Sequence, residues 1–480
     1  STETIVILHT NDFHGAVEPQ VSSGGTDESG GLVNLVSLID KIRAENAENV
    51  LLLDAGDTFQ GSYVSNSTGG QVIMAAMNAA GYDAWTLGNH EFDWGQELLR
   101  SRIAEAQFPV LAANLLDAAT GELWSEVEPY TVVTAGAVRV AVLGLAYPDT
   151  PAINKPQNVA GLNFRGAAET VRQYLPELES QADLIVVLSH LGLDGDRNLA
   201  AAVDGLDVIV GGHTHVFLER PDEVNGTIIA QAGTKGQVVG RLEVTVDLET
   251  GEVIAYSRSQ VLLPVNNNLA SVNQEVKSLV DAALEQAAGA MDQSIGTTAR
   301  PLHPQRSGEF ALGNLVVDAL LAADLSDGSV PDIAMHNNGG VRAALPKGPI
   351  TYGQLYEVLS FDNQVVAVDL TGEQVRRILE HSVANRSPNM QVAGLAFRFD
   401  GTRPVYQRVV EVTVGARPLE PDEVYRVVTI DYLAAGGDGQ ETFLEGENLT
   451  YGDTEVWAVA GYIRAHSPVD PRVQGRITGG

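Results

Sequence analysis

The sequence predicts an α/β fold divided into two domains, and three observations carry this prediction. The first is the length of 480 residues, because single hydrophobic cores stop growing near ~250–300 residues. The second is that short apolar, β-branched runs alternate with segments of helical period through residue 230. This alternation is typical of βαβ units around a mainly parallel sheet. The third is a change of pattern near Ser271, after which a different order of helices and strands follows.

Six apolar runs in the first half are predicted strands, and the segments between them are long enough for crossover helices. In the first of these segments, Leu32, Leu35, Val36, Ile39 and Ile42 recur at three- and four-residue spacing, as expected of a helix packed on a sheet by one face. The predicted strands are residues 5–8, 50–53, 84–87, 138–143, 184–188 and 208–210.

A connecting helix is predicted after Ser271, which forms a capping box with Gln274 and precedes an apolar stripe. We expect this helix to end at Gly296, followed by a second domain with its own helices (312–325, 372–382) and strands (365–370, 409–414, 425–430). The predicted organisation is a domain at residues 1–265, a linker helix at 266–296 and a C-terminal domain at 297–480.

The composition excludes several classes of function. Lys and Arg total 29 against 62 Asp and Glu, and this net charge of −33 opposes binding to nucleic acid polymers or anionic membranes. With no cysteine, the chain has no disulfides, thiolate nucleophiles or Cys-based zinc sites. The longest apolar stretch, residues 132–147, contains Arg139 and is too short for a membrane span. P-loop and G-x-S-x-G motifs are also absent from the sequence.

Residues able to bind metal follow five of the six predicted strands. Because reactive residues in open α/β sheets collect beyond the carboxyl ends of the strands, we expect one sheet edge to gather them. Glycines beside them would allow the sharp turns that such loops need. The candidates, in chain order, are Asp12, His14, Asp57, Asn89, His90, His190, His213 and His215.

A mixed set of Asp, Asn and His ligands favours Zn²⁺, Mn²⁺ or Co²⁺ over Ca²⁺ and Mg²⁺. Two such ions close together repel, so they require a shared anionic ligand, for which Asp57 is the candidate. We expect Asp12, His14 and His215 to complete the shell of one ion. Asn89, His190 and His213 would complete the shell of the other.

The second domain carries a cation after a glycine turn and two candidate aromatic side chains. Arg342 follows the glycine turn Asn337-Asn338-Gly339-Gly340, where a guanidinium can bind phosphate. Phe361 follows a strand-like segment, and Tyr432 precedes Gly436-Gly437-Asp438-Gly439. Two aromatic faces can hold a base by stacking. Taken singly, each aromatic residue is more simply explained as part of the core.

These blocks together resemble a known family, the calcineurin-like metallophosphoesterases, and within it the 5′-nucleotidase and UDP-sugar hydrolase group. The blocks that carry the resemblance are Asp12-Phe13-His14, Gly56-Asp57, Gly88-Asn89-His90-Glu91-Phe92-Asp93, Ser189-His190, Gly211-Gly212-His213-Thr214-His215, Leu312-Gly313-Asn314-Leu315 and Gly436-Gly437-Asp438-Gly439.

The resemblance implies a four-layer α/β/β/α catalytic domain with two metal ions and an α/β substrate domain. It implies that His90 and Asp93 form a catalytic dyad, that Phe361 and Tyr432 clamp the base, and that Asp438 binds the ribose. Arg342 and Asn337 would contact phosphate and base or sugar. The family often carries a further arginine where this sequence has Gly308, and Arg306 is the candidate replacement.

The function so implied is dimetal hydrolysis of nucleoside 5′-phosphates, with di- and triphosphates and UDP-sugars as further candidate substrates. The alternatives are a 2′,3′-cyclic phosphodiesterase with 3′-nucleotidase activity and a non-catalytic nucleotide-binding protein. The resemblance also implies a secreted, periplasmic or cell-surface location, although the first residues do not read as a signal peptide.

Some polar residues have simpler interpretations. We expect His9 to be structural, Asp54 to make local hydrogen bonds, and Asp194 and Asp196 to lie in a solvated loop. His303, His336 and His381 lack partners at ligand spacing and are expected at the surface or satisfied in the core.

Overall fold

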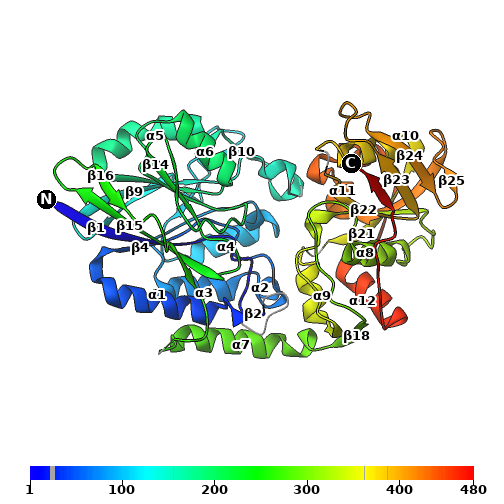
Figure 1. Cartoon of the computed structure of the whole chain (residues 1–480), viewed down its shortest axis with the longest axis horizontal. Helices are drawn as coiled ribbons and strands as arrows, with labels where there is room; N and C mark the ends of the chain where they lie inside the picture. Colours follow the sequence, from blue (N-terminus) through cyan, green and yellow to red (C-terminus); the bar gives the residue numbers. More distant parts are fainter. Residues whose placement is uncertain (22–27, 155, 270, 362, 386) are drawn as a thin grey trace. The chain divides into compact units, whose positions relative to one another are not determined.

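The computed structural model describes residues 1–480 except 22–27, 155, 270, 362 and 386 (Figure 1). The chain forms two compact units, Ser1–Ala287 and Ala288–Gly480, each with its own sheets. The division falls within helix α7 (Gln274–Met291). Among the described residues, no helix is both long and apolar enough to cross a membrane.

The first unit contains two large sheets. In the first sheet, the parallel strands β1 (Thr2–Thr10), β4 (Val50–Asp54), β5 (Ala84–Thr86) and β6 (Val110–Leu111) lie side by side. Three antiparallel strands extend this sheet beyond β1: β15 (Val238–Asp247), with β16 (Val253–Tyr256) and β17 (Leu262–Pro264) pairing to it.

The second sheet is also mostly parallel. Its parallel strands are β9 (Val138–Leu145), β11 (Leu184–Ser189), β12 (Val208–Gly211) and β14 (Thr227–Gln231). Antiparallel β8 (Tyr130–Ala135) and β13 (Asp222–Val224) form its edges. The two short pairs of this unit are β2 (Gln20–Val21) with β3 (Glu28–Ser29) and β7 (Leu115–Asp117) with β10 (Leu162–Phe164).

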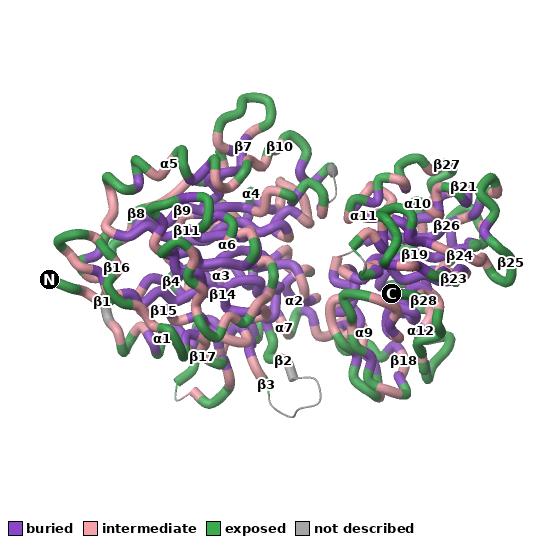
Figure 2. The backbone as a smooth tube through the Cα atoms, turned by 45° about the horizontal axis from the view of Figure 1, so that its top comes forward, coloured by how far each residue is buried: buried purple, intermediate pink, exposed green. Residues whose placement is uncertain are grey.

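Alternation along the strands explains why both faces of the second sheet are buried. In β11, Leu184, Val186 and Leu188 pack into the core between the two sheets, which they share with β1, β4 and β15. The intervening Ile185 and Val187 face α5 (Ala167–Gln181) and α6 (Leu193–Ala202). Because side chains in a strand alternate between its faces, each such strand serves two cores. Figure 2 shows these strands buried and the outer face of α5 exposed.

Helices cover the outer faces of both sheets. Helices α1 (Leu32–Asn46) and α3 (Gln71–Ala80) pack together on the first sheet, and α5 and α6 cover the second (Figure 1). Helices α2 (Tyr63–Ser67) and α4 (Gln96–Glu105) lie beside α3. The predicted four-layer α/β/β/α order is thereby confirmed.

The second unit is built on a five-stranded sheet in the order β22 (Met390–Ala393), β19 (Ile333–Asn337), β26 (Val424–Ile430), β21 (Gln364–Thr371) and β27 (Glu447–Thr454). A smaller sheet comprises β25 (Arg417–Pro418), β24 (Val409–Val414), β23 (Leu395–Phe399) and β28 (Ile477–Gly479), while β18 (Ser294–Thr298) pairs with β20 (Gly348–Thr351). The helices are α8 (Ala311–Leu321), α9 (Tyr352–Val358), α10 (Gly372–Ser382), α11 (Asp431–Ala434) and α12 (Glu455–His466).

Two details of helix α7 differ from the prediction. Its N-terminal cap is Asn273, whose Oδ1 accepts a hydrogen bond from the backbone N–H of Val276 at 2.9 Å, and not Ser271. A capping residue must directly precede the first helical turn, and the helix begins at Gln274. The helix ends at Met291 and not at Gly296, because Gly296 lies in strand β18, where it pairs with β20.

Candidate metal centre

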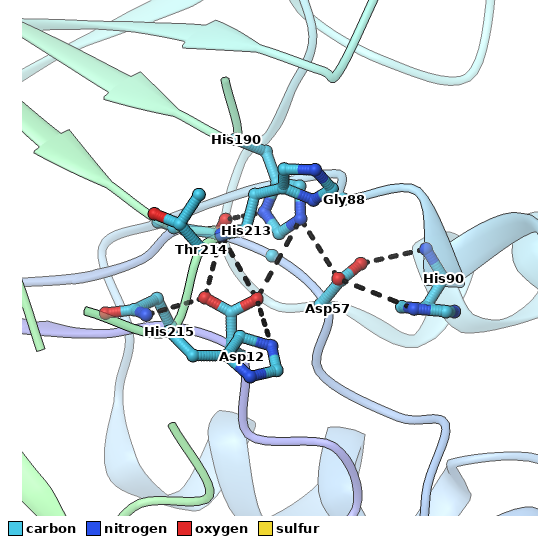
Figure 3. Close-up of polar contacts among 12 residues, drawn as sticks. Asp12, Asp57, Gly88, His90, His190, His213, Thr214 and His215 are labelled. Atoms are coloured by element: carbon cyan, nitrogen blue, oxygen red, sulfur yellow. Dashed lines mark hydrogen bonds and ion pairs between the residues drawn. The ribbon is translucent and has the colours of Figure 1, made fainter. Parts of the chain in front are cut away.

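The predicted metal-binding residues lie at the carboxyl ends of five strands, but these strands belong to two sheets. Asp12, Asp57 and Asn89 follow β1, β4 and β5 of the first sheet, whereas His190 and His213 follow β11 and β12 of the second. The expectation of a single sheet edge was therefore wrong. The two sheets stack face to face and bring their carboxyl ends together, so loops from both enclose one site (Figure 3).

The candidate ligands form two groups. In each group, one potential ligand atom from every residue lies within 4.8 Å of the others. The first group is Asp12, His14 and His215, in which the Nε2 atoms of the two histidines are 3.1 Å apart. The second group is Asp57, His190 and His213.

Asp57 lies between the two groups. Its Oδ2 is 3.0 Å from His190 Nε2 in its own group and 4.0 Å from His14 Nε2 in the other. Asp12, a member of the first group, also lies near the second group, with its Oδ1 4.0 Å from His190 Nε2. Figure 3 shows the two carboxylates side by side, with the imidazoles around them. A carboxylate in this position is suited to bridge two cations.

The donor atoms at this site fit bound cations. Asn89 is 2 % exposed, yet its Oδ1 has no hydrogen-bond partner among the described residues. Buried polar atoms without a partner are rare because desolvation costs about 1–3 kcal/mol per group. A cation would compensate this oxygen. The nitrogen and oxygen donors suit borderline divalent metals.

The charges of the site are strongly coupled. Burial favours the neutral form of Asp57, but the neighbouring His190, His90 and His14 hold the pKa of its carboxyl well below its usual range. Burial opposes protonation of His190, but Asp57 and Asp12 raise the pKa of this imidazole to about 10. Burial and His190 lower the pKa of His213 to about 4. The site thus combines anionic carboxylates with an imidazole whose proton a metal must displace.

The backbone of the ligand loops is held in an uncommon conformation. Asp12, His14, Asp57, His213 and His215 all have positive φ angles, between 49° and 75°. L-residues seldom adopt this region, and such strain persists only where surrounding contacts enforce it. The contacts include hydrogen bonds from Asp12 N to Gly56 O and from His14 N to Asp57 O, which continue the pairing of β1 with β4.

Two polar residues without an assigned role in the sequence organise these loops. Glu91 is buried, and its carboxylate accepts hydrogen bonds from the backbone N–H groups of Asp57, Thr58 and Gly88 at 2.6–2.9 Å. Burial and Asp57 raise the pKa of Glu91 to about 8. The sequence shows Glu91 within a motif block, but nothing in its spacing reveals these contacts.

Gln231, at the end of β14, holds the loop that carries His213 and His215. Its Oε1 accepts from Val216 N at 2.7 Å and from Thr214 Oγ1 at 3.1 Å, and its Nε2 donates to Gly212 O at 3.1 Å. These three partners alternate with the two histidines along the chain. Gln231 is completely buried, and a lone glutamine gives no sequence signal of such a role.

His90 and Asp93 form the pair that the resemblance implies. His90 Nδ1 is 2.7 Å from Asp93 Oδ2, and because the carboxylate accepts, Nδ1 carries the proton. His90 Nε2 lies 4.0 Å from Asp57 Oδ2, beside the second ligand group. The backbone N–H of His90 donates to Asp57 Oδ1 at 2.8 Å.

Within the second unit, the candidate substrate residues form two sets. Arg342 lies with its guanidinium carbon 5.4 Å from the centre of the Phe361 ring. Asp438 accepts from Tyr432 Oη at 2.7 Å and from Asn337 Nδ2 at 2.8 Å. Arg306 is exposed in the loop before α8.

The remaining histidines lie at the surface or in the core, as expected. His9 and His336 are buried, the latter with Nε2 2.6 Å from Glu455 Oε1, while His303 is exposed. Half-buried His381 lies with its Nε2 3.0 Å from the carbonyl oxygen of Asp438.

The two aspartates of Leu193-Asp194-Gly195-Asp196 differ from the loop interpretation. Asp194 is exposed, but Asp196 is completely buried in the first turn of α6, where it accepts from Ser189 Oγ. The segment after His190 is therefore a helix and not a loop. Helix α6 has Gly192 at its N-cap, with a positive φ of 81°. Asp54 makes the local bonds expected, accepting from Gly56 N, Thr58 Oγ1 and Thr10 Oγ1.

This layered fold with paired ligand groups matches two family models. Residues 5–217 match the calcineurin-like phosphoesterases and residues 288–445 match the 5′-nucleotidase C-terminal domain. A 5′-nucleotidase of Diplobatis ommata is 32% identical over 98% of this chain and 89% of its own length. The trifunctional nucleotide phosphoesterase YfkN of Bacillus subtilis is 31% identical over 98% of this chain, which spans only 35% of that protein.

The same similarity appears in a solved structure. A 5′-nucleotidase precursor from Thermus thermophilus superposes with a TM-score of 0.91 and 34% sequence identity, covering 99% of both chains. The chain belongs to the 5′-nucleotidase family of calcineurin-like phosphoesterases. It is a metal-dependent phosphoric monoester hydrolase with two candidate metal sites.

Proposed function

We propose that this protein is a dimetal 5′-nucleotidase that hydrolyses nucleoside 5′-phosphates to nucleoside and phosphate. The observation that carries the proposal is the position of Asp57 between two ligand groups, with the His90–Asp93 pair beside it. The match of the second unit to the 5′-nucleotidase C-terminal domain supports a nucleotide as the substrate.

In this proposal Asp12, His14 and His215 would hold the first ion, Asn89, His190 and His213 would hold the second, and Asp57 would serve both. Zn²⁺, Mn²⁺ and Co²⁺ suit this donor set. Two such ions polarise a phosphoryl group and activate water for in-line attack. The −33 charge of the chain repels phosphate, and the cations reverse that charge locally.

His90 stabilises the charge that develops on the phosphoryl oxygens and on the leaving alkoxide. Its Nδ1–H is held by Asp93, so Nε2 is the ring atom available to the substrate. From this position Nε2 faces the oxygens on which charge develops. In this proposal His90 acts on the substrate and not on a metal.

The second unit supplies the nucleoside site. Phe361 and Tyr432 stack on the base, Asp438 accepts the ribose hydroxyls, and Asn337 orients Asp438 through its 2.8 Å hydrogen bond. Arg342, beside Phe361, contacts the phosphate of the substrate. Arg306 is proposed as the further cation of this site.

A second candidate function is hydrolysis of 2′,3′-cyclic nucleotides and 3′-nucleotides on the same scaffold. A relative named as a trifunctional nucleotide phosphoesterase is a reason to test more than one kind of nucleotide phosphoester. Di- and triphosphates and UDP-sugars, which the resemblance of the motif blocks implies as further candidates, belong in the same substrate panel. From the family resemblance, we also propose a secreted, periplasmic or cell-surface location.

The test is product analysis, by chromatography and by phosphate release, with AMP, 3′-AMP, 2′,3′-cyclic AMP, ADP, ATP and UDP-glucose, using metal-free enzyme refilled with one metal at a time. The proposal expects the highest kcat/KM with AMP and about two ions per chain. His90→Ala should retain both ions and lose most turnover. A higher kcat/KM for 2′,3′-cyclic AMP would favour the second candidate, and binding of AMP without turnover of any substrate in the panel by any metal form would reject both.

A further inference from the structure

The loop after strand β9 contributes no candidate ligand, yet it contacts the ligands of its neighbours. β9 is the one predicted strand of the first unit whose carboxyl end has no metal-binding residue. Tyr147 in this loop stacks on the His213 ring, with centroids 4.1 Å apart and an interplanar angle of 28°. Buried Asn114 anchors the base of the loop by donating to Ala146 O and accepting from Ala146 N.

Asn154, further along the same loop, reaches across to the loop of β5. Its Nδ2 donates to the backbone carbonyl of Asn89 and to Oδ1 of Asp93, both at 3.0 Å. Asn158 supports it from behind, donating from Nδ2 to Asn154 Oδ1 at 3.2 Å and to Asp93 O at 2.8 Å. Asn154 is 4 % exposed and Asn158 8 % exposed, so water competes little for these bonds.

We propose that Asn154 is a positioning residue that fixes the Asp93 carboxylate and, through it, the imidazole of His90. The inference rests on the roles proposed above for His90 and Asp93. Asp93 accepts from His90 through Oδ2 and from Asn154 through Oδ1. With a donor on each oxygen, the carboxylate cannot rotate about its terminal bond without breaking one of the two contacts.

The second bond of Asn154 links this pair to the metal centre. Asn89 precedes His90 and carries the orphaned Oδ1 that we assign to the second ion. By holding the Asn89 carbonyl and the Asp93 side chain with one amide group, Asn154 sets the distance between a ligand and the pair that acts on substrate. A small displacement of a catalytic group costs turnover far more than it costs binding.

A double-mutant cycle separates this role from general support of the loop. Asn154→Leu removes both donated bonds at similar volume, and Asn154→Asp keeps the shape but loses the donors. Each is combined with His90→Ala. Turnover is measured with p-nitrophenyl phosphate and with AMP, bound metal by elemental analysis, and stability by thermal unfolding. Asn163→Asp, exposed in β10, is the control for an added charge.

We expect Asn154→Leu to lower kcat about 10- to 100-fold with little change in KM and with both ions retained, as is typical for partners of active-site groups. In the His90→Ala background the same change should cost less than about twofold, because the residue it positions is gone. The inference would be overturned if the kcat losses of the two single substitutions multiplied in the double mutant, or if Asn154→Leu lost metal.

If Asn154→Leu unfolds, the Asn154→Asp cycle decides in the same way. Failure of the proposed function is recognised separately, since it would appear as full activity of His90→Ala on both substrates or as turnover of p-nitrophenyl phosphate without turnover of AMP.

Discussion

The hydroxyl group of Tyr432 donates a 2.7 Å hydrogen bond to Oδ1 of Asp438, and the backbone N–H of Asp438 donates back to the same hydroxyl at 3.1 Å. Asn337 holds the other carboxylate oxygen. Asp438 has a positive φ of 54°, so its backbone gains from each of these contacts. Each carboxylate oxygen keeps a second lone pair, which gives the group two acceptor positions for ribose hydroxyls.

Tyr432→Phe tests this arrangement. The substitution keeps the ring face for stacking and removes only the hydroxyl group that orients Asp438. We expect KM for AMP to rise about 5- to 10-fold, in line with the net contribution of one hydrogen bond, while kcat for p-nitrophenyl phosphate is unchanged. Tyr130→Phe, which removes an exposed hydrogen bond to Glu177, is the matched control. An unchanged KM for AMP would show that Asp438 is held well enough without the hydroxyl.

Asp57→Asn tests the shared carboxylate. An amide cannot bridge two cations through anionic oxygens, so we expect metal content to fall from about two ions per chain to one or fewer. We also expect turnover to fall at least about 100-fold. Elemental analysis of the purified variant gives the metal content, with the exposed Asp194→Asn as control. Retention of both ions with full occupancy would mean that another residue, such as Asp12, is the bridge.

Gln231→Leu tests the support of the His213 and His215 loop. The change removes three hydrogen bonds at a completely buried position and leaves the left-handed backbone of both histidines less constrained. Metal affinity should decrease about 10- to 100-fold, measured by titration of metal-free protein. Activity should return at high metal concentration, as it would not if the whole domain were disrupted. The exposed Gln71→Leu is the control.

His9 makes the first unit sensitive to acid. Both ring nitrogens lack a partner among the described residues, and burial lowers the pKa of this imidazole from 6.5 to about 4. Below pH 6.5 the unfolded chain binds a proton that the folded chain does not, so stability is complete above pH 6.5 and is lost as pH falls toward 4. The contribution lost is about 3 kcal/mol.

The measurement is urea unfolding of metal-free protein between about pH 7.5 and about pH 4, with His9→Leu alongside. The free energies of unfolding of the two proteins should converge or cross as the pH falls, because the variant cannot titrate at this position. Parallel pH curves for the two proteins would rule out His9 as a source of acid sensitivity.

Much of the local structure follows from short-range pattern. Strand β24 and helix α10 have the predicted boundaries, and β1, β4, β9, β11 and β12 extend the predicted runs by a few residues. These elements are set by apolar periodicity and by caps such as Thr371 with Gln374. Where no such signal was present, the prediction failed, as at Asp196, which is buried and accepts a hydrogen bond from Ser189 of strand β11.

The sequence by itself determined which residues could bind metal and in which loops they lie, because a strand ending in Asp, Asn or His beside glycine is a local feature. It also determined the number of domains and the α/β class, through length and periodicity. The tertiary structure decided that the ligands come from two stacked sheets and that Asp57 lies between the two groups. It also decided that Asn154, Gln231 and Glu91 hold the loops in place. These contacts join residues far apart in the chain, and they form only when the packing of both sheet faces brings the loops together.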